Sequence, residues 1–551
     1  MLQAEDSNFA RMNKAWRFNV EDYWPCRLLH IPTMTSIQRH TDDEYTSPNG
    51  KVYQRPRYSI LTYTWGRFRQ GSGPALPVNG TQWGIPPIDP EKFTVSAFQR
   101  VVNDHLASDG IEWAWIDVAC INQAANSREN AEEVGHQAAI FDKADAVFVW
   151  LWSLDTATVT NVFKDICNQG PQLEEDIERF PGDFDTPLYN TMISLRKALN
   201  KLLQDPWFSS LWTLQELVLR KDAKILSSEV ETVVWEEKWT ANMITLVNVC
   251  QNIWQIMETI EQRQVKSLHY DDDGSSLRSK LDIEVTDIKK SLLSAGFYYL
   301  FSDNPNVQYG TARFRTTLHH EDRIYAIMQI YNLRVGKSAR PELPPELHPS
   351  LTELELEFGA AISKSCPIVG QLFTHTMKEL PKRSWCITME STVPDELRAY
   401  RNPEPQCQMA LTEAGTLKAQ GKCCRLKDLS DYLRHLSVNY PAVKYGDIYL
   451  DQYVHTALNE AGFDTRKSCL NNASLIPMLL MRYRIPNLMV LQLGRISLAD
   501  ASLRIGLILG NSHPAETRQN VRPVYYRYGV YTWVKPTKAE VDWQERELLI
   551  E

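Results

Sequence analysis

The 551-residue sequence predicts an α/β fold built on a mainly parallel sheet flanked by helices. Short segments rich in β-branched and aromatic residues alternate along the chain with segments whose apolar residues recur at helical spacing. Such alternation requires crossover connections between parallel strands, and the connecting helices then cover both faces of the sheet. The predicted strands are residues 58–66, 113–121, 146–151 and 223–226.

The segments between these strands carry helix signals. Apolar residues mark one face of a helix at 94–106, and Ser127 can cap a second helix that runs to about Lys143. An insertion at about 155–205 interrupts the alternation with a charged stretch, which is followed by a helix near 191–203. The core is therefore expected to contain helical insertions.

The whole chain is expected to have four parts. A lead-in precedes the α/β core, a helical extension follows the core, and a proline-rich connection leads to a C-terminal α+β region whose sequence gives no chemistry. Within the last part, residues 408–427 predict a β-hairpin that turns near Gly415, and residues 524–534 predict a strand. The expected boundaries are 1–57, 58–230, 231–340 and 341–551.

Composition excludes several classes of protein. The chain is 43% hydrophobic with a net charge of −9, so it lacks the basic surface of a nucleic-acid-binding protein. The apolar run Leu475–Met481 is too short to span a membrane. Ten cysteines show neither a disulfide framework nor a C-x-x-C spacing. We therefore expect reduced thiols, a cytoplasmic protein and no metal site.

Familiar cofactor motifs are missing from the sequence. There is no phosphate-binding glycine loop and no G-x-S-x-G nucleophile elbow. Adjacent His319 and His320 would point about 100° apart on a helix, which makes them a poor chelate. No cofactor is expected to be required.

The segment Trp207–Leu219 places one carboxylate, Glu216, among large apolar residues. Asp205-Pro206 breaks the chain before it, and Ser209 or Ser210 can cap the helix that follows. Trp212 lies four residues before Glu216, so the indole and the carboxylate share a helix face. An apolar setting can tune the ionisation of such a carboxylate. The structural alternative is a capping box formed by Thr213 and Glu216.

Four positions lie at or near the carboxyl ends of predicted strands, where open α/β sheets bind ligands. They are Gly66, Asp117, Asn122 and Gln123. Trp65, beside the first of them, is an aromatic residue that would either stack on a ligand ring or pack in the core. Asp117 would either bind a ligand or cap the following turn.

Several separated motifs, in the right order, resemble those of fungal heterokaryon-incompatibility (HET) domain proteins. They include YSILTYTWG at 58–66, WIDVACINQ at 115–123, LWTLQEL at 211–217 and EDRIYAI at 321–327. Thr62 departs from the serine that is usual in the family. HET domains are similar in fold to TIR domains, which have a flavodoxin-like parallel sheet. The segment from Trp212 to Leu217 resembles the W-C-x-x-E-L of plant TIR domains, with Thr213 in place of the cysteine.

The resemblance implies a function in fungal self/non-self recognition and programmed cell death. In TIR domains that split NAD+, the glutamate matching Glu216 is catalytic, and Gly66 matches the glycine that closes the first strand. NAD+ would then be the substrate, with Trp212 packed beside Glu216. Trp65, Asp117, Asn122 and Gln123 would contribute to substrate binding.

The alternative that the resemblance leaves open is a non-catalytic signalling module that acts by oligomerisation. A homo-oligomer is expected in that case, and either version would respond to an incompatible-allele product or a sensor protein.

Overall fold

The computed structural model describes most of the chain and divides it into two compact units. The first, here called the N-terminal unit, holds residues 18–300 and 314–348; the second, the C-terminal unit, holds residues 301–313 and 349–551. The described residues are 21–64, 73–124, 127–179, 186–236, 239–267, 276–298, 300, 304–377, 383–439, 446–452, 488–497, 502–511, 523–534 and 541–551.

A six-stranded sheet of order β2-β1-β6-β5-β7-β8 forms the centre of the N-terminal unit. The strands β6, β5, β7 and β8 are mutually parallel, which confirms the predicted mainly parallel sheet. The pair β1–β2 joins antiparallel to the edge of β6 and comes from the segment expected to precede the core. The strands are β1 (Arg27–His30), β2 (Thr35–Gln38), β5 (Tyr58–Thr62), β6 (Trp113–Trp115), β7 (Ala146–Trp150) and β8 (Lys224–Leu226).

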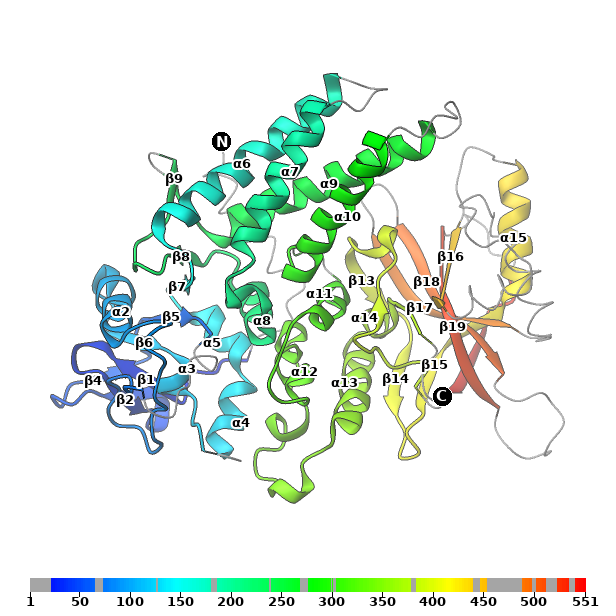
Figure 1. The fold of residues 1–551 in the computed structure, drawn as a ribbon. Coiled ribbons are helices and arrows are strands. Elements are labelled where there is room, and N and C mark those ends of the chain that lie inside the picture. The colour runs from blue at the N-terminus through cyan, green and yellow to red at the C-terminus, as the bar shows by residue number, and fades with distance from the viewer. Residues whose placement is uncertain are drawn as a thin grey trace. The chain divides into compact units, whose positions relative to one another are not determined.

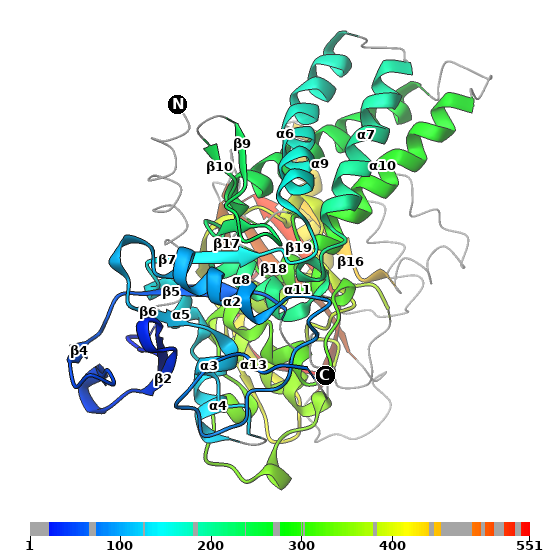
Figure 2. The same cartoon turned by 60° about the vertical axis from the view of Figure 1, so that its left-hand side comes forward.

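Helices cover both faces of this sheet (Figure 2). Tyr58 in β5 and Tyr63 just after it show this, because side chains alternate between the two faces along the chain. The Tyr58 hydroxyl donates to the Ile140 carbonyl on one face. The Tyr63 ring, just beyond the strand, lies 6.3 Å from the ring of Phe98 on the other face. The helical elements around the sheet are α2 (Val95–Arg100), the π-helical segment η4 (Val101–Leu106), α3 (Asp117–Cys120), α4 (Arg128–Val134), α5 (Gln137–Lys143), η6 (Pro206–Ser209) and α8 (Leu211–Leu219).

Two sequence-based boundaries in this region are wrong. The strand expected at 113–121 ends at Trp115, because the Ile116 carbonyl accepts from the N–H groups of Ala119 and Cys120 and starts the turn α3. The helix expected from Ser127 to about Lys143 is two helices that meet at Gly135. Ser127 does cap the first of them, since its hydroxyl accepts from the Asn130 N–H.

The insertion is more helical than the sequence indicates. Its charged first half belongs to the long helix α6 (Thr156–Arg179), which continues through Pro171 and packs against α7 (Thr186–Leu202). Two later helices, α9 (Met243–Ser267) and α10 (Ser276–Ala295), pack against this pair, and the four lie side by side in Figure 1. Short hairpins β3–β4 (Glu44–Thr46, Val52–Gln54) and β9–β10 (Val234–Glu236, Trp239–Thr240) and the turns α12 (Asp322–Tyr325), η8 (Met328–Tyr331) and η9 (Gly336–Ser338) complete the unit.

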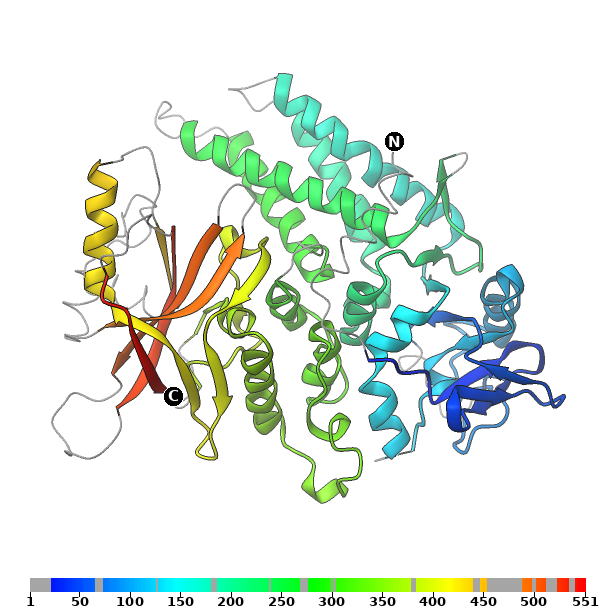
Figure 3. The ribbon, with the colours of Figure 1, turned by 180° about the vertical axis from the view of Figure 1, so that it is seen from behind.

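The C-terminal unit is built on an antiparallel sheet with a strand order that returns on itself. The order β17-β18-β19-β20-β15 closes into a ring because β15 also pairs with β17. Among the pairings of the described strands, β19–β20 is the parallel one. Leu429 and Leu433 of helix α15 (Leu426–Asn439) pack with Tyr531 and Trp533 of this sheet. Figure 3 shows α15 from behind, as the yellow helix beside the sheet. The predicted hairpin near Gly415 and the predicted strand at 524–534 are both confirmed.

The elements of the C-terminal unit have the following bounds. The strands are β11 (Thr374–His375), β12 (Ser391–Thr392), β13 (Arg401–Pro405), β14 (Gln408–Leu411), β15 (Leu417–Arg425), β16 (Gly446–Leu450), β17 (Met489–Ser497), β18 (Ser502–Asn511), β19 (Val524–Val534) and β20 (Gln544–Ile550). The helices are α11 (Asn306–Thr311), α13 (Leu351–Ser365), α14 (Pro367–Gln371) and α15 (Leu426–Asn439).

Each cysteine that the structure describes is buried and carries a free thiol, as expected. None of the helices in the described ranges combines the length and the apolar character that crossing a membrane requires.

Candidate functional site

Glu216 lies in the second half of helix α8, and its carboxyl group does not cap that helix. The helix begins at Leu211, so Glu216 is not in the first turn. The Thr213 hydroxyl donates to the Ser210 carbonyl at 2.9 Å, and the Leu211 N–H donates to the carbonyl of Thr316 at 3.0 Å. Ser210 occupies the N-cap position without a side-chain hydrogen bond to the helix. The capping-box alternative is therefore wrong, and Glu216 is available for another role.

The Glu216 carboxyl group points toward the carboxyl end of strand β5. The hydroxyl of Thr62, the last residue of β5, donates to Glu216 Oε2. The Thr62 oxygen in turn accepts from the indole N–H of Trp207 at 2.8 Å. Strands β6 and β7 flank β5 on opposite sides. The side on which the chain adds its next strand therefore switches at β5. Open α/β sheets bind ligands at such a switch point, outside the carboxyl ends of the strands.

The surroundings of Glu216 bring the pKa of its carboxyl group close to 7. Burial raises the pKa of this carboxyl from its ordinary value to about 7, while the Thr62 hydrogen bond and the Arg315 charge act in the opposite direction. The residue nevertheless keeps partial exposure to solvent. A carboxyl group with these properties can exist in both protonation states near pH 7, which is typical of functional sites.

Arg315 is the charged group that attracts the Glu216 carboxylate, and it is itself buried. One of its terminal nitrogens donates to the carbonyls of Trp207 at 3.2 Å and of Ser210 at 3.0 Å. The same nitrogen donates to the Thr213 hydroxyl at 3.1 Å. The guanidinium therefore fixes the turn that precedes α8 and supplies a positive charge beside the site.

The Trp212 indole has a hydrogen-bond partner of its own, and its packing beside Glu216 stays a prediction. Its indole N–H donates to Asp322 Oδ2 at 3.2 Å, and the same carboxylate accepts from the Thr317 hydroxyl at 2.9 Å. The indole that reaches the Glu216 carboxyl through one intervening group is that of Trp207. A contact of Trp212 with a substrate stays a prediction.

The three polar residues after β6 make local hydrogen bonds. Asp117 is the first residue of α3, and its Oδ1 accepts from the Val118 N–H at 2.7 Å, while Ile116 occupies the N-cap position. The ligand-binding and turn-capping alternatives for Asp117 both stay predictions. Gln123 Nε2 donates to the carbonyl of Ile121 at 2.8 Å. Asn122 Oδ1 accepts from the Ala124 N–H at 3.0 Å. That these three side chains contact a ligand stays a prediction.

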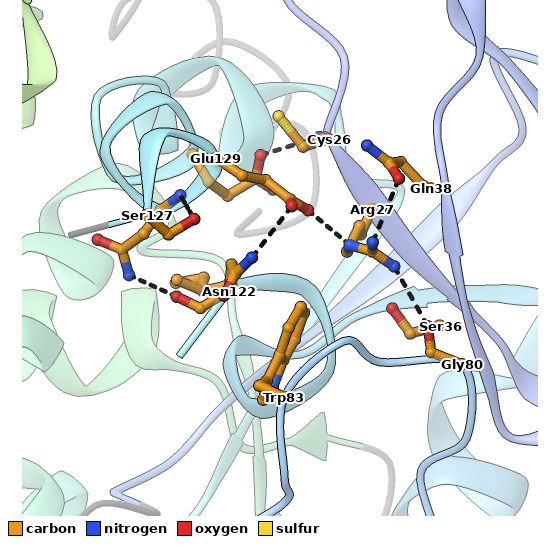
Figure 4. Close-up of polar contacts among 12 residues, drawn as sticks. Cys26, Arg27, Ser36, Gln38, Gly80, Trp83, Asn122, Ser127 and Glu129 are labelled. Atoms are coloured by element: carbon orange, nitrogen blue, oxygen red, sulfur yellow. Dashed lines mark hydrogen bonds and ion pairs between the residues drawn. The ribbon is translucent and has the colours of Figure 1, made fainter. Parts of the chain in front are cut away.

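Asn122 also belongs to a buried polar network that joins the first strand to helix α4 (Figure 4). Its side-chain amide donates to Glu129 Oε2 at 3.3 Å, and Glu129 Oε1 pairs with Arg27 Nε at 2.5 Å. The Arg27 guanidinium lies 5.3 Å from the centre of the Trp83 ring. The network explains how the loop after β6 is held in place. Trp65 and Gly66, the other two expected site residues, lie outside the described residues.

A second glutamate with a raised pKa shows what distinguishes Glu216. Burial raises the pKa of Glu133 to about 7 as well. Its carboxylate accepts from the Cys26 N–H at 2.8 Å and from the Trp115 indole at 2.7 Å, and the residue is fully buried. Because Glu133 has no exposure, its role is structural. Glu216 combines a similar pKa with partial exposure of the residue and a hydrogen bond to the carboxyl end of β5.

Sequence reasoning missed three residues of this site, Thr62, Trp207 and Arg315. Thr62 is 154 residues away from Glu216 in the chain, and Arg315 comes from a later segment. Trp207 begins the segment that contains Glu216, but its indole reaches the carboxyl only through Thr62. One signal was present, since Thr62 and the usual family serine share a hydroxyl group at this position.

Comparison with known proteins supports part of the resemblance. The family model described as heterokaryon incompatibility protein (HET) matches residues 58–216, from the first residue of β5 to Glu216. No curated protein and no solved structure matches the chain. The segment that carries β5, β6, β7 and most of α8 is therefore similar to HET domains, and the match supports a role in heterokaryon incompatibility.

Proposed function

We propose that the protein acts in heterokaryon incompatibility through a TIR-like core that hydrolyses NAD+ to nicotinamide and ADP-ribose, with Glu216 as the catalytic carboxylate. The observation that carries the proposal is the position of the Glu216 carboxyl, with a pKa of about 7, at the carboxyl end of β5. This is the edge at which sheets of this kind bind ligands. The TIR-like W-T-L-Q-E-L sequence supports the same residue.

One carboxylate suffices for this chemistry. The bond between the nicotinamide nitrogen and ribose C1′ breaks, and its electron pair leaves with nicotinamide as a neutral molecule, so no general acid is needed. The transition state carries positive charge on the ribose ring, which a nearby carboxylate stabilises. Water then adds to C1′ and releases a proton. Because the carboxylate form of Glu216 is required, the rate should rise as pH increases through about 7.

The test is nicotinamide release from NAD+ by the purified full-length protein over a wide range of protein concentrations. The variants Glu216→Ala and Glu216→Gln should lose activity by about 100-fold or more, the loss typical of removing one group that stabilises transition-state charge. Glu91→Gln, an exposed glutamate in the same unit, should leave the rate unchanged. A rate that rises more steeply than protein concentration would indicate activation by homo-oligomerisation.

Two outcomes would overturn the proposal. Full activity in folded Glu216→Gln would remove this residue from catalysis. No nicotinamide release by the wild-type protein at any concentration would favour the non-catalytic module that signals by oligomerisation.

A further inference from the structure

We infer that Thr62 is the positioning residue of the site: with Trp207 it forms a one-way hydrogen-bond relay that fixes which oxygen of Glu216 acts on the substrate. The relay is here called the Trp207–Thr62–Glu216 relay. The inference rests on the proposed role of Glu216, but the geometry that carries it can be tested without catalysis.

The direction of the relay follows from the chemistry of its members. An indole N–H can only donate, so the Thr62 oxygen must accept from Trp207 Nε1 at 2.8 Å. A threonine hydroxyl has a single proton, and the remaining partner of Thr62 is Glu216 Oε2. The hydroxyl proton therefore points to Oε2. When Glu216 is ionised, the reverse direction is impossible, because a carboxylate cannot donate and an indole N–H cannot accept.

This direction makes the two carboxyl oxygens of Glu216 different. In the ionised form Oε2 accepts a hydrogen bond from Thr62. As long as this bond is kept when Glu216 binds a proton, the proton is carried by Oε1. Since Oε2 is hydrogen-bonded to Thr62 of β5, Oε1 is the oxygen that faces the substrate ribose. The relay also favours the carboxylate over the acid, because hydrogen bonds to the charged form lower its energy.

The donor end of the relay is held rigidly. Trp207 is 1% exposed, and its backbone N–H donates to Asp205 Oδ1 at 2.9 Å. Asp205 Oδ2 accepts from the Ser153 N–H at 3.0 Å, which ties the turn η6 to the segment after β7. The Trp207 carbonyl accepts from Arg315 at 3.2 Å. An indole anchored at both backbone ends can keep a small hydroxyl oriented.

The side chain of Thr62 suits this task. It ends the central strand β5 and is almost fully buried, and its β-branched form restricts rotation about χ1. Valine has the same shape without the hydroxyl, whereas serine keeps the hydroxyl without the branch. The charged group that acts on Glu216 from the surrounding elements, Arg315, is unchanged by either substitution.

The decisive experiment titrates Glu216 in three variants. Thr62→Val removes the relay and should move the midpoint of the Glu216 titration upward by about one pH unit, because the carboxylate loses a hydrogen bond. Trp207→Phe removes the donor but leaves the hydroxyl, so a smaller upward shift is expected. Thr62→Ser should keep the wild-type midpoint. Ser59→Ala, which removes another buried hydroxyl from β5, is the control for general effects on this strand.

Two readouts keep failure of the inference separate from failure of the proposed function. The first is the pH dependence of NAD+ cleavage between about pH 5.5 and 9, in which Thr62→Val should lose about 5-fold at pH 7 and regain most of that loss at pH 9. The second is the carboxyl band in infrared difference spectra, assigned by its disappearance in Glu216→Gln, and it needs no activity.

Equal midpoints in Thr62→Val, Thr62→Ser and the wild-type protein would overturn the inference. If Thr62→Val does not fold, the titration midpoints of Trp207→Phe and Thr62→Ser are compared instead. Equal midpoints in these two variants would likewise overturn the inference. An inactive wild-type protein whose infrared midpoint still shifts would refute the NAD+ hydrolase proposal and leave the relay standing.

Discussion

Asp451→Asn is expected to lower the free energy of unfolding of the C-terminal unit by about 3–5 kcal/mol. Asp451 and Arg527 form an ion pair in which both side chains are 0% exposed. Arg527 Nη1 lies 2.7 Å from Oδ1 and 2.9 Å from Oδ2, and Oδ1 also accepts from the His375 N–H at 2.9 Å. Asparagine would leave the guanidinium charge buried without a counter-charge, which is the costly way to break such a pair.

Hydrogen exchange of the β19 amides measures this effect in the unit concerned. Asp431→Asn is the matched control, because Asp431 pairs with Lys427 at a site where both side chains are well exposed, and its loss should cost below about 1 kcal/mol. Replacing both buried partners, as Asp451→Leu with Arg527→Met, should recover part of the stability, since no charge is then left unpaired. A change of less than about 1 kcal/mol in Asp451→Asn would contradict the assigned role.

Local patterns were enough to predict the elements whose contacts follow their own periodicity. Strands β5 and β7 are rich in β-branched and aromatic residues, and both are buried in the parallel sheet as expected. Leu211, Leu214 and Val218, which recur at helical spacing in the sequence, are buried in α8. These features depend on the spacing of residues within one segment, which the sequence displays directly.

Features that depend on distant partners were not predictable in the same way. The strand pair β1–β2 joins the sheet because Leu29 pairs with Ala114, a partner 85 positions later in the chain (114 − 29). The strand β6 stops early because the carbonyl of Ile116 captures two later N–H groups, although the apolar pattern continues to Ile121. Apolar periodicity alone does not report which of two backbone hydrogen-bond patterns a buried segment adopts.

The candidate site shows the same division. Glu216 could be singled out because a carboxylate among large apolar residues is visible in one segment. Trp212 was expected beside it from helical spacing, whereas the indole connected to the carboxyl is that of Trp207, five residues earlier in the chain than Trp212. The turn η6 and the capping by Asp205 direct Trp207 toward β5. Helical spacing describes neighbours on α8 and carries no information about the strand that the carboxyl meets.

Glu216→Gln is expected to make the protein more stable than the wild type above pH 7, by about 2 kcal/mol. The folded-state pKa of Glu216, about 7, lies above its unfolded value. Between these two values the folded state binds more protons than the unfolded state. The contribution of Glu216 is therefore most favourable below the unfolded pKa and is lost as pH rises through about 7. Glutamine has no charge to desolvate and can still accept from the Thr62 hydroxyl.

Urea unfolding at about pH 4 and pH 8.5 tests this expectation. The variant and the wild type should have nearly equal stability at the lower pH and should differ at the higher pH. Glu133 carries its own raised pKa, but it is present in both proteins and cancels from their difference. Glu91→Gln, at an exposed position, should show no such pH-dependent difference. A difference between Glu216→Gln and wild type that does not change with pH would mean that folding does not raise the pKa of Glu216.

The sign of this effect is the opposite of the one expected for Asp451. Replacing Asp451 should weaken folding of the C-terminal unit, because its carboxylate neutralises the buried charge of Arg527. Glu216 is held by Thr62 and Arg315, yet these partners do not offset the cost of burying its charge. If the variant is both more stable at pH 8.5 and unable to release nicotinamide from NAD+, the ionised carboxylate is retained for its chemistry at the expense of stability.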